Sequence, residues 1–217
     1  AMRSPLRLVL MIALLTLAGC QSAYYGALEK VGIAKRDILV TRVERAQKAQ
    51  GEAKEQFADA LQAFLAVTRV DGGELGRKYD QLNTQFTRSE ARAKEVHERI
   101  AAIDDVAGAL FDEWGNELGL YSNPELRARS QEQLAATRTR YAALMTTMRR
   151  AADRMQPVLV TFRDQVLFLK HNLNAQALRA LDTTVRDLQG DISTLIAEMD
   201  KSMSEADAFI RNLRAAN

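Results

Sequence analysis

Apolar residues recur at alternating spacings of three and four positions through most of this chain. Four segments carry the pattern, at residues 28–67, 79–114, 134–173 and 178–213. Such spacing places apolar side chains on one face of an α-helix, and its long persistence is typical of helices that pack as coiled coils. None of the sequence alternates with a period of two for long enough to predict a β-strand. The pattern therefore predicts an all-α protein built from about four long helices.

Turn and capping residues separate the four segments. Residues 71–73 are a strong turn signal, and Asn123 with Pro124 matches an N-cap followed by the first residue of a helix. Asn172 or Asn174 marks the last junction. Because the connections are short, neighbouring helices should run antiparallel. We expect an elongated up-down-up-down bundle, whose helices of roughly forty residues are each about 60 Å long.

Two features of the third segment depart from the regular pattern. Pro157 lies inside it, where a proline removes a backbone hydrogen bond and clashes with the preceding turn at a cost of about 3 kcal/mol. We therefore expect a kink or a short break around Met155 to Pro157. The apolar residues of the stretch 166–174 are continuous, so this part of the helix is predicted to be buried on all sides, in the core or against a further partner.

The N-terminus has a different pattern from the rest of the chain. Two arginines precede an apolar run over residues 8–18, which has the length of a signal-peptide core and falls short of the ~20 residues of a spanning helix. The run ends at Gly19 and Cys20, the only cysteine of the chain. Residues 17–20 resemble the lipobox of bacterial lipoproteins. That resemblance implies cleavage between Gly19 and Cys20 and acylation of the Cys20 thiol, with palmitate among the expected fatty acids.

An ordinary signal peptide or an uncleaved anchor, with a cysteine there by coincidence, is the alternative. On the lipoprotein interpretation the chain divides into a leader at 1–19, a lipidated cysteine with a short tether at 20–27, and one helical-bundle domain at 28–217. Two or three acyl chains would hold it stably at a bilayer. In lipoproteins that are sorted by the residue after the cysteine, an Asp at that position retains the protein at the inner membrane. Gln21 stands there instead, so we expect the periplasmic face of the outer membrane.

The formal net charge of +2 belongs to the leader. Removal of residues 1–19 takes away Arg3 and Arg7 and no acidic residue, so the rest of the chain carries equal numbers of acidic and basic side chains. A nucleic-acid partner needs a basic surface and access to the nucleic acid. Balanced charge and export therefore argue against nucleic acid as a partner.

The remaining charge is uneven along the chain. Basic residues predominate over residues 125–154, and acidic residues predominate over residues 182–207. These flanks could attract each other across neighbouring helices, each exposed pair contributing a few tenths of a kcal/mol. Alternatively, the arginines form a surface for an anionic envelope partner. The candidate residues for that surface are Arg138, Arg149, Arg150 and Arg154.

Candidate catalytic groups are sparse. His97 and His171 lie on different predicted helices without metal-ligand spacing, and the sequence contains no nucleotide-binding or nucleophile motif. The adjacent acids at 104–105 and 112–113 should diverge on a helix and be solvated. We therefore predict no metal, no cofactor and no enzymatic activity. One aromatic set could form a binding site or close one end of the bundle; it comprises Leu110, Phe111, Trp114 and Tyr121.

Four stretches resemble an uncharacterised family of proteobacterial lipoprotein-like proteins, a domain of unknown function. They are residues 24–32, 54–61, 110–114 and 162–175. The resemblance implies a helical, envelope-located protein and no known activity.

Together these features favour a membrane-anchored lipoprotein that acts as a non-enzymatic structural scaffold or partner-binding module in the periplasm. The expected partners are the membrane, through the lipid anchor, and an envelope protein. The alternative function is a helical module that binds a hydrophobic ligand or a lipid where Pro157 and the glycines weaken the bundle. Self-association through residual apolar stripes stays open.

Overall fold

The computed structural model describes residues 34–68, 74–172 and 175–215, with the backbone alone described for residues 175–183. The leader, Gly19, Cys20, the tether and the turn predicted at residues 71–73 lie outside the described residues. Four long helices and one short 3₁₀ helix make up the described chain. They are α2 (Lys35–Val67), α3 (Leu75–Glu117), η2 (Leu118–Leu120), α4 (Pro124–His171) and α5 (Ala175–Ala215).

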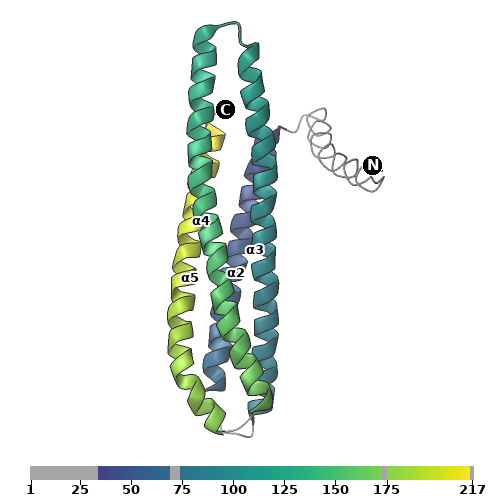
Figure 1. Cartoon of the computed structure of the whole chain (residues 1–217), viewed down its shortest axis with the longest axis vertical. Helices are drawn as coiled ribbons and strands as arrows, with labels where there is room; N and C mark the ends of the chain where they lie inside the picture. Colours follow the sequence, from purple (N-terminus) through teal and green to yellow (C-terminus); the bar gives the residue numbers. More distant parts are fainter. Residues whose placement is uncertain (1–33, 69–73, 173–174, 216–217) are drawn as a thin grey trace, which may run out of the picture.

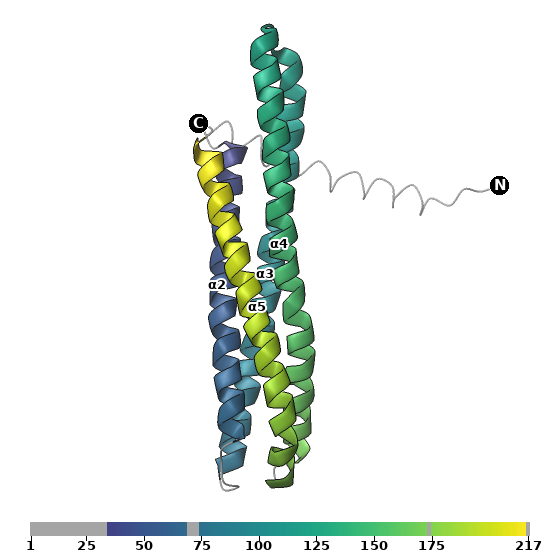
Figure 2. The same cartoon turned by 90° about the vertical axis from the view of Figure 1, so that its left-hand side faces the viewer.

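The helices form an antiparallel bundle, as the sequence predicts. Helix α2 packs against α3 and α5, and α4 packs against the same two helices, so the order around the bundle follows the order in the chain. Figures 1 and 2 show an elongated rod in which each helix reverses the direction of the one before it. The all-α prediction is thus confirmed for the described chain.

The predicted apolar seams form the core. Every seam position of α2 from Leu39 to Val67 is buried, and the seams of the other helices are buried along most of their lengths. Phe162 of α4 is fully buried in the core, with its ring 5.8 Å from that of Phe64 and 5.5 Å from that of Phe86, both in edge-on geometry. Aromatic pairs in this arrangement add to the stability from burial alone.

One layer of this core is polar. Gln50 and Ser202 are fully buried, and the Ser202 hydroxyl donates to Gln50 Oε1 at 2.9 Å. The Gln50 amide also donates to the carbonyl oxygen of Met148 at 3.5 Å. The layer thus joins α2, α4 and α5. Because an axial slip would leave these groups unpaired in the interior, the layer favours one register of the bundle.

Helices α3 and α4 extend beyond their neighbours. They contain 43 and 48 residues, against 33 in α2 and 41 in α5. The extra length projects past the start of α2 and the end of α5 as a two-helix hairpin (Figure 2). We call residues 112–133 of this hairpin the tip, and the rest of the described chain the body.

Of the kink or short break predicted around Met155 to Pro157, the break is absent, because α4 runs continuously through Pro157. Proline at this position leaves the carbonyl of Asp153 without its helical hydrogen bond. Both residues are exposed. Water can therefore satisfy that carbonyl, and the helix continues.

The prediction for residues 166–174 is wrong in its expectation of burial on all sides. Val166 and Leu169 are buried in the core, but the side chains of Leu167 and Phe168 are 53% and 41% exposed. Consecutive helical residues point about 100° apart. The body covers only one face of α4 at this level, so the intervening residues face outward.

Candidate functional site

The predicted arginine surface lies on α4, and the structure divides it into two parts. Arg149, Arg150 and Arg154 line a shallow, open depression of about 660 Å³ on α4, together with Thr146, Asp153 and Pro157 of the same helix. Arg138 lies nearer the tip, where its guanidinium donates to the carbonyl oxygen of Phe111 at 3.2 Å and lies 5.5 Å from the Phe111 ring. Three of the four predicted arginines therefore share a surface, which we call the arginine cleft.

Two arginines of the cleft are tied to neighbouring helices on opposite sides. Arg149 pairs with Asp104 of α3, while Arg154 Nε donates to Glu198 Oε1 of α5 at 3.2 Å. Their side chains remain 55% and 50% exposed despite these pairs. The Arg150 side chain is exposed, and no ion pair to it is found within the described part of the chain. The cleft thus combines two anchored guanidinium groups with one that is open to solvent.

The acidic side chains of α5 bind residues of two neighbouring helices, α4 and α2, rather than of α4 alone. Besides the Arg154–Glu198 pair, Asp200 accepts from Lys54 Nζ at 2.5 Å and Asp207 accepts from Gln47 Nε2 at 2.8 Å. Both of these donors are on α2. The opposite charges of α4 and α5 therefore attract in part, while other α5 acids hold α2 in place.

Asp104 is part of a polar network between α3 and α4, whereas the sequence predicts it to be solvated. The Tyr141 hydroxyl donates to Asp104 Oδ1 at 2.5 Å, and Arg149 binds the other carboxylate oxygen. Burial, and then the hydrogen bond to Asp104, raise the pKa of Tyr141 above its usual value. The phenol therefore stays protonated at neutral pH and acts as a hydrogen-bond donor that holds two helices together.

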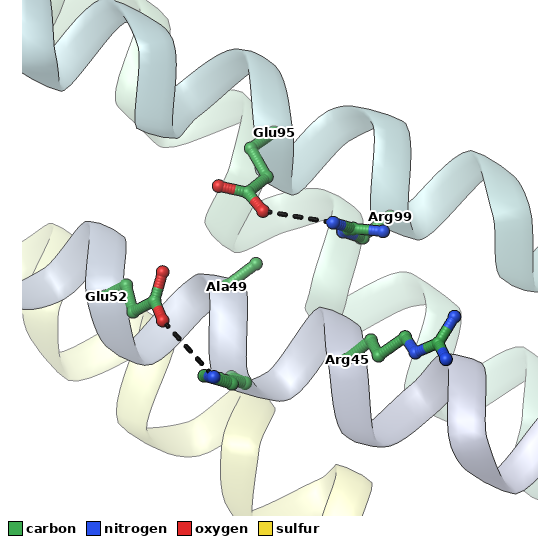
Figure 3. Close-up of a pocket in the computed structure, with 6 residues that line it drawn as sticks. Arg45, Ala49, Glu52, Glu95 and Arg99 are labelled. Carbon is green, nitrogen blue, oxygen red and sulfur yellow. Dashed lines mark hydrogen bonds and ion pairs between the residues drawn. The ribbon is translucent and has the colours of Figure 1, made fainter.

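A second charged cleft, of about 310 Å³, lies between α2 and α3 (Figure 3). Glu95 of α3 accepts from Arg99 at 3.2 Å and from Arg92 at 2.9 Å. These two hydrogen bonds, with Arg99 the larger contributor, lower the pKa of Glu95. Arg92 also donates to Glu52 of α2 at 2.6 Å, so it joins the two helices.

Sequence reasoning did not identify this α2–α3 cleft. A sequence signal for this cleft was present. Lys48 and Glu52 of α2 are opposite charges four residues apart, and so are Glu95 and Arg99 of α3. The pairing through Arg92 depends on the two helices facing each other. The carboxylates here are neutralised by neighbouring cations, which makes this cleft a stabilising contact between α2 and α3.

A third cleft, of about 570 Å³, lies where the start of α2 meets the base of the tip. It contains Leu110, Trp114 and Tyr121 of the predicted aromatic set, whereas Phe111 is buried and packs 5.3 Å from the Tyr141 ring. The Trp114 indole donates to Ser130 Oγ at 2.8 Å. The structure therefore divides the aromatic set between a cleft and the core.

Contacts from α2 close one side of this third cleft. Lys35 Nζ donates to Glu113 Oε1 at 2.9 Å, and the guanidinium of Arg36 lies 6.0 Å from the Trp114 ring. Lys35 is itself buried. These contacts fix the start of α2 against the part of α3 that forms the base of the tip.

His97 and His171 are both exposed, on α3 and α4. Across the described ranges, no cluster of three or more His, Cys, Asp or Glu side chains is arranged to hold a metal ion. No helix in the described part of the chain has the length and apolar character needed to cross a membrane.

Comparison with protein families gives a match over residues 24–213, to the family described as Protein of unknown function (DUF2959). The chain belongs to this family. Neither the curated proteins nor the solved structures contain a match to the DUF2959 chain. The resemblance found from the sequence is therefore confirmed at the level of the family.

The matched range of the DUF2959 chain contains the arginine cleft, the other two clefts and the whole tip. Cys20 precedes it. Family membership thus covers the helical bundle and its surfaces, while the prediction of a lipid anchor rests on residues 1–20 alone.

Proposed function

We propose that this protein is a lipid-anchored protein at the periplasmic face of the outer membrane, where its helical rod is a non-enzymatic scaffold that binds an acidic envelope partner. The observation that carries the partner-binding part is the arginine cleft, which stays open to solvent after its internal pairs are made. The leader and Cys20 support the anchor.

The chemistry of the arginine cleft fits a partner with carboxylates. Arg150 and Arg154 are four residues apart and lie on one side of α4, a spacing that an acidic helix alongside it can match. Guanidinium groups bind carboxylates in a planar, two-point geometry. Because Arg154 is already oriented by Glu198, it loses less side-chain freedom when a partner binds.

The contacts that the polar side chains make within the bundle support a non-enzymatic role. Asp104, Glu113 and Glu95 each bind a cation of the chain, and Tyr141 is held as a protonated donor. Groups committed in this way stabilise the rod. Catalysis instead needs converging groups whose protons can move.

The anchor is tested by the mass of the mature chain and by a Cys20→Ala variant produced in the native host. We expect an N-terminal peptide that starts at a diacylglyceryl Cys20, recovered in the outer-membrane fraction. The Cys20→Ala chain should lack the acyl mass, keep its leader and be missing from the outer-membrane fraction. An unmodified Cys20, or a variant recovered in the outer-membrane fraction to the same extent, would contradict the anchor.

The partner is tested by Arg150→Glu, with Arg140→Glu as the matched control. Both arginines are exposed on α4, and neither has an ion pair within the described residues, so helicity should be kept in both variants. A photo-crosslinker at Thr146, in the same cleft, should capture one defined envelope protein. Arg150→Glu should abolish that crosslink and Arg140→Glu should keep it. Capture of abundant bystanders alone, or equal crosslinking in both variants, would count against the proposal.

A further inference from the structure

The tip exposes large apolar side chains at its end. Leu120 is 83% exposed, Leu126 is 50% exposed and Tyr121 is 42% exposed. The three residues lie close together, because η2 leads through a short turn directly into the first turn of α4. They lie at the projecting end of the rod (Figure 2), and the third cleft, which Tyr121 also lines, lies at the base of the tip.

The first turn of α4, at this end of the rod, has its backbone donors satisfied. Asn123 Oδ1 accepts from the backbone N–H groups of Glu125 at 2.9 Å and Leu126 at 3.2 Å. Pro124 has no N–H, and Arg127 donates its own to the carbonyl oxygen of Asn123 at 3.1 Å. Unsatisfied backbone donors are the main cost of placing a helix end in a lipid environment. The Asn123 cap removes most of that cost here.

The tip lies at the end of the rod where the N-terminal chain enters. Helix α2 begins at Lys35, which binds Glu113, and Leu120 is seven residues further along the hairpin, a rise of about 10 Å. The thirteen residues between Cys20 and Ala34 would span about 20 Å even if helical, and more if extended. An acylated Cys20 and the tip can therefore reach the same bilayer at the same time.

We propose that the tip is a second membrane contact, in which Leu120, Tyr121 and Leu126 enter the interfacial region of the phospholipid bilayer that holds Cys20. The contact makes the rod stand end-on, with the arginine cleft on its side held away from the membrane. This inference rests on the lipid anchor of the proposed function.

The residues around the tip fit a lipid surface. Tyrosine combines an apolar ring with a polar hydroxyl and is enriched at membrane interfaces. Arg127 and Arg129 are exposed next to Leu126, and no ion pair to either is found within the described residues, so both can bind phosphate groups. The other large exposed apolar residues lie along the side of α4, where a bilayer touching the end of the rod does not reach them; they are Val160, Leu167 and Phe168.

A fluorophore at the tip tests the contact in the full lipidated chain. Acylation blocks the Cys20 thiol, so Ser122→Cys supplies the one free thiol for an environment-sensitive nitrobenzoxadiazole label. The control is Asn83→Cys, an exposed site of α3 far from the tip. In vesicles of phosphatidylethanolamine with a minor fraction of phosphatidylglycerol, the tip label should shift to shorter wavelength and be quenched by nitroxide-labelled lipid. The label at residue 83 should do neither.

A paired set of charge substitutions identifies the side chains responsible. Leu120→Asp with Leu126→Asp should abolish the shift, since each buried leucine changes partitioning by about tenfold. Val160→Asp with Leu167→Asp should leave the shift unchanged, because these residues lie on the side of the rod. Circular dichroism should be the same for both pairs.

Three outcomes would overturn the inference. One is equal emission from residues 122 and 83 in a chain whose mass shows acylated Cys20. Another is a shift that occurs without vesicles and grows with protein concentration, which would indicate contact between two copies of the tip. The third is a shift that survives the tip aspartates. If the mass instead shows unmodified Cys20, the anchor fails, and labelled Ser122→Cys on a Cys20→Ser background with added vesicles decides the tip contact separately.

Discussion

Helices α3 and α4 run through both the body and the tip of this rod, yet the two regions differ in how they are held together. In the body, the apolar face of each helix meets two neighbours and is buried. In the tip, α3 and α4 pack on each other and meet α2 only at the base, through Glu113 and Trp114. Ser130 is the one buried residue between 112 and 133. Burial is therefore set by the number of neighbouring helices at each level of the rod.

The tip compensates with local hydrogen bonds. The Asn123 cap holds the first turn of α4, and the Trp114–Ser130 bond joins its two helices. Such contacts contribute about 1 kcal/mol each, whereas a large core side chain contributes several. The tip should thus open locally more often than the body. A region with few internal contacts also keeps its apolar side chains available to a surface outside the chain.

The largest expected effect is that of a core truncation in the body. Phe162→Ala removes a fully buried ring that packs on Phe64 and Phe86, and should lower the free energy of unfolding by about 3–5 kcal/mol. Leu126→Ala in the tip should change it by less than about 0.5 kcal/mol. Urea unfolding followed by circular dichroism measures both. Equal losses would remove the distinction between body and tip.

The polar layer of the body should give the next largest effect. Ser202→Ala leaves Gln50 Oε1 without its hydroxyl donor in the interior and should cost about 1–3 kcal/mol in unfolding free energy. Ser193→Ala, at an exposed site of the same helix, is the control and should be nearly neutral. The same urea titration applies. A neutral Ser202→Ala would mean that the layer contributes little to stability.

Loss of the Asn123 cap should act on the tip alone. Asn123→Ala removes the acceptor for two backbone N–H groups and should cost about 1 kcal/mol in local stability. Hydrogen exchange should quicken by about fivefold at tip amides and stay unchanged in the body. Faster exchange throughout α2 and α5 would show that body and tip open as one unit.

The smallest expected effect concerns acid stability at the α2–α3 cleft. The pKa of Glu95 is lowered from 4.5 by its hydrogen bonds to Arg99 and Arg92. A carboxyl whose folded pKa is depressed stabilises the protein above the unfolded pKa, and this stability is lost as the pH falls through the folded pKa. The melting temperature should therefore decline below about pH 4.5, and Glu95→Gln should weaken that decline. An identical decline in both proteins would assign it to other carboxyls.

Most of the fold was accessible from the sequence, because helix formation and capping are local. Asn123 and Pro124 do begin α4, and Asn172 follows its last residue. Most seam positions are buried as expected, and two of the buried positions, Gln50 and Ser202, are polar. The position of Pro157 was also plain in the sequence, but the continuity of α4 depends on the Asp153 carbonyl facing water, which the sequence does not state.

The candidate sites were accessible only in part. The sequence identified the arginines of α4, but not that Arg149 would bind α3, Arg154 would bind α5 and Arg138 would cap a carbonyl near the tip. It grouped Phe111 with Trp114, which the structure separates. Which neighbour a side chain meets depends on helix order and axial offset, and both arise from contacts distant in the chain.

The sequence by itself determined that this chain forms long amphipathic helices, where two of their ends lie, which face of each is buried and which family the chain belongs to. These properties follow from residue spacing, capping chemistry and similarity along the chain. Only the tertiary structure decided that α3 and α4 extend beyond α2 and α5 at one end of the rod. It also decided which charges pair across helices. The physical reason is that periodicity fixes the direction of a side chain around its helix, whereas the sliding of one helix along another is fixed by packing of the whole core.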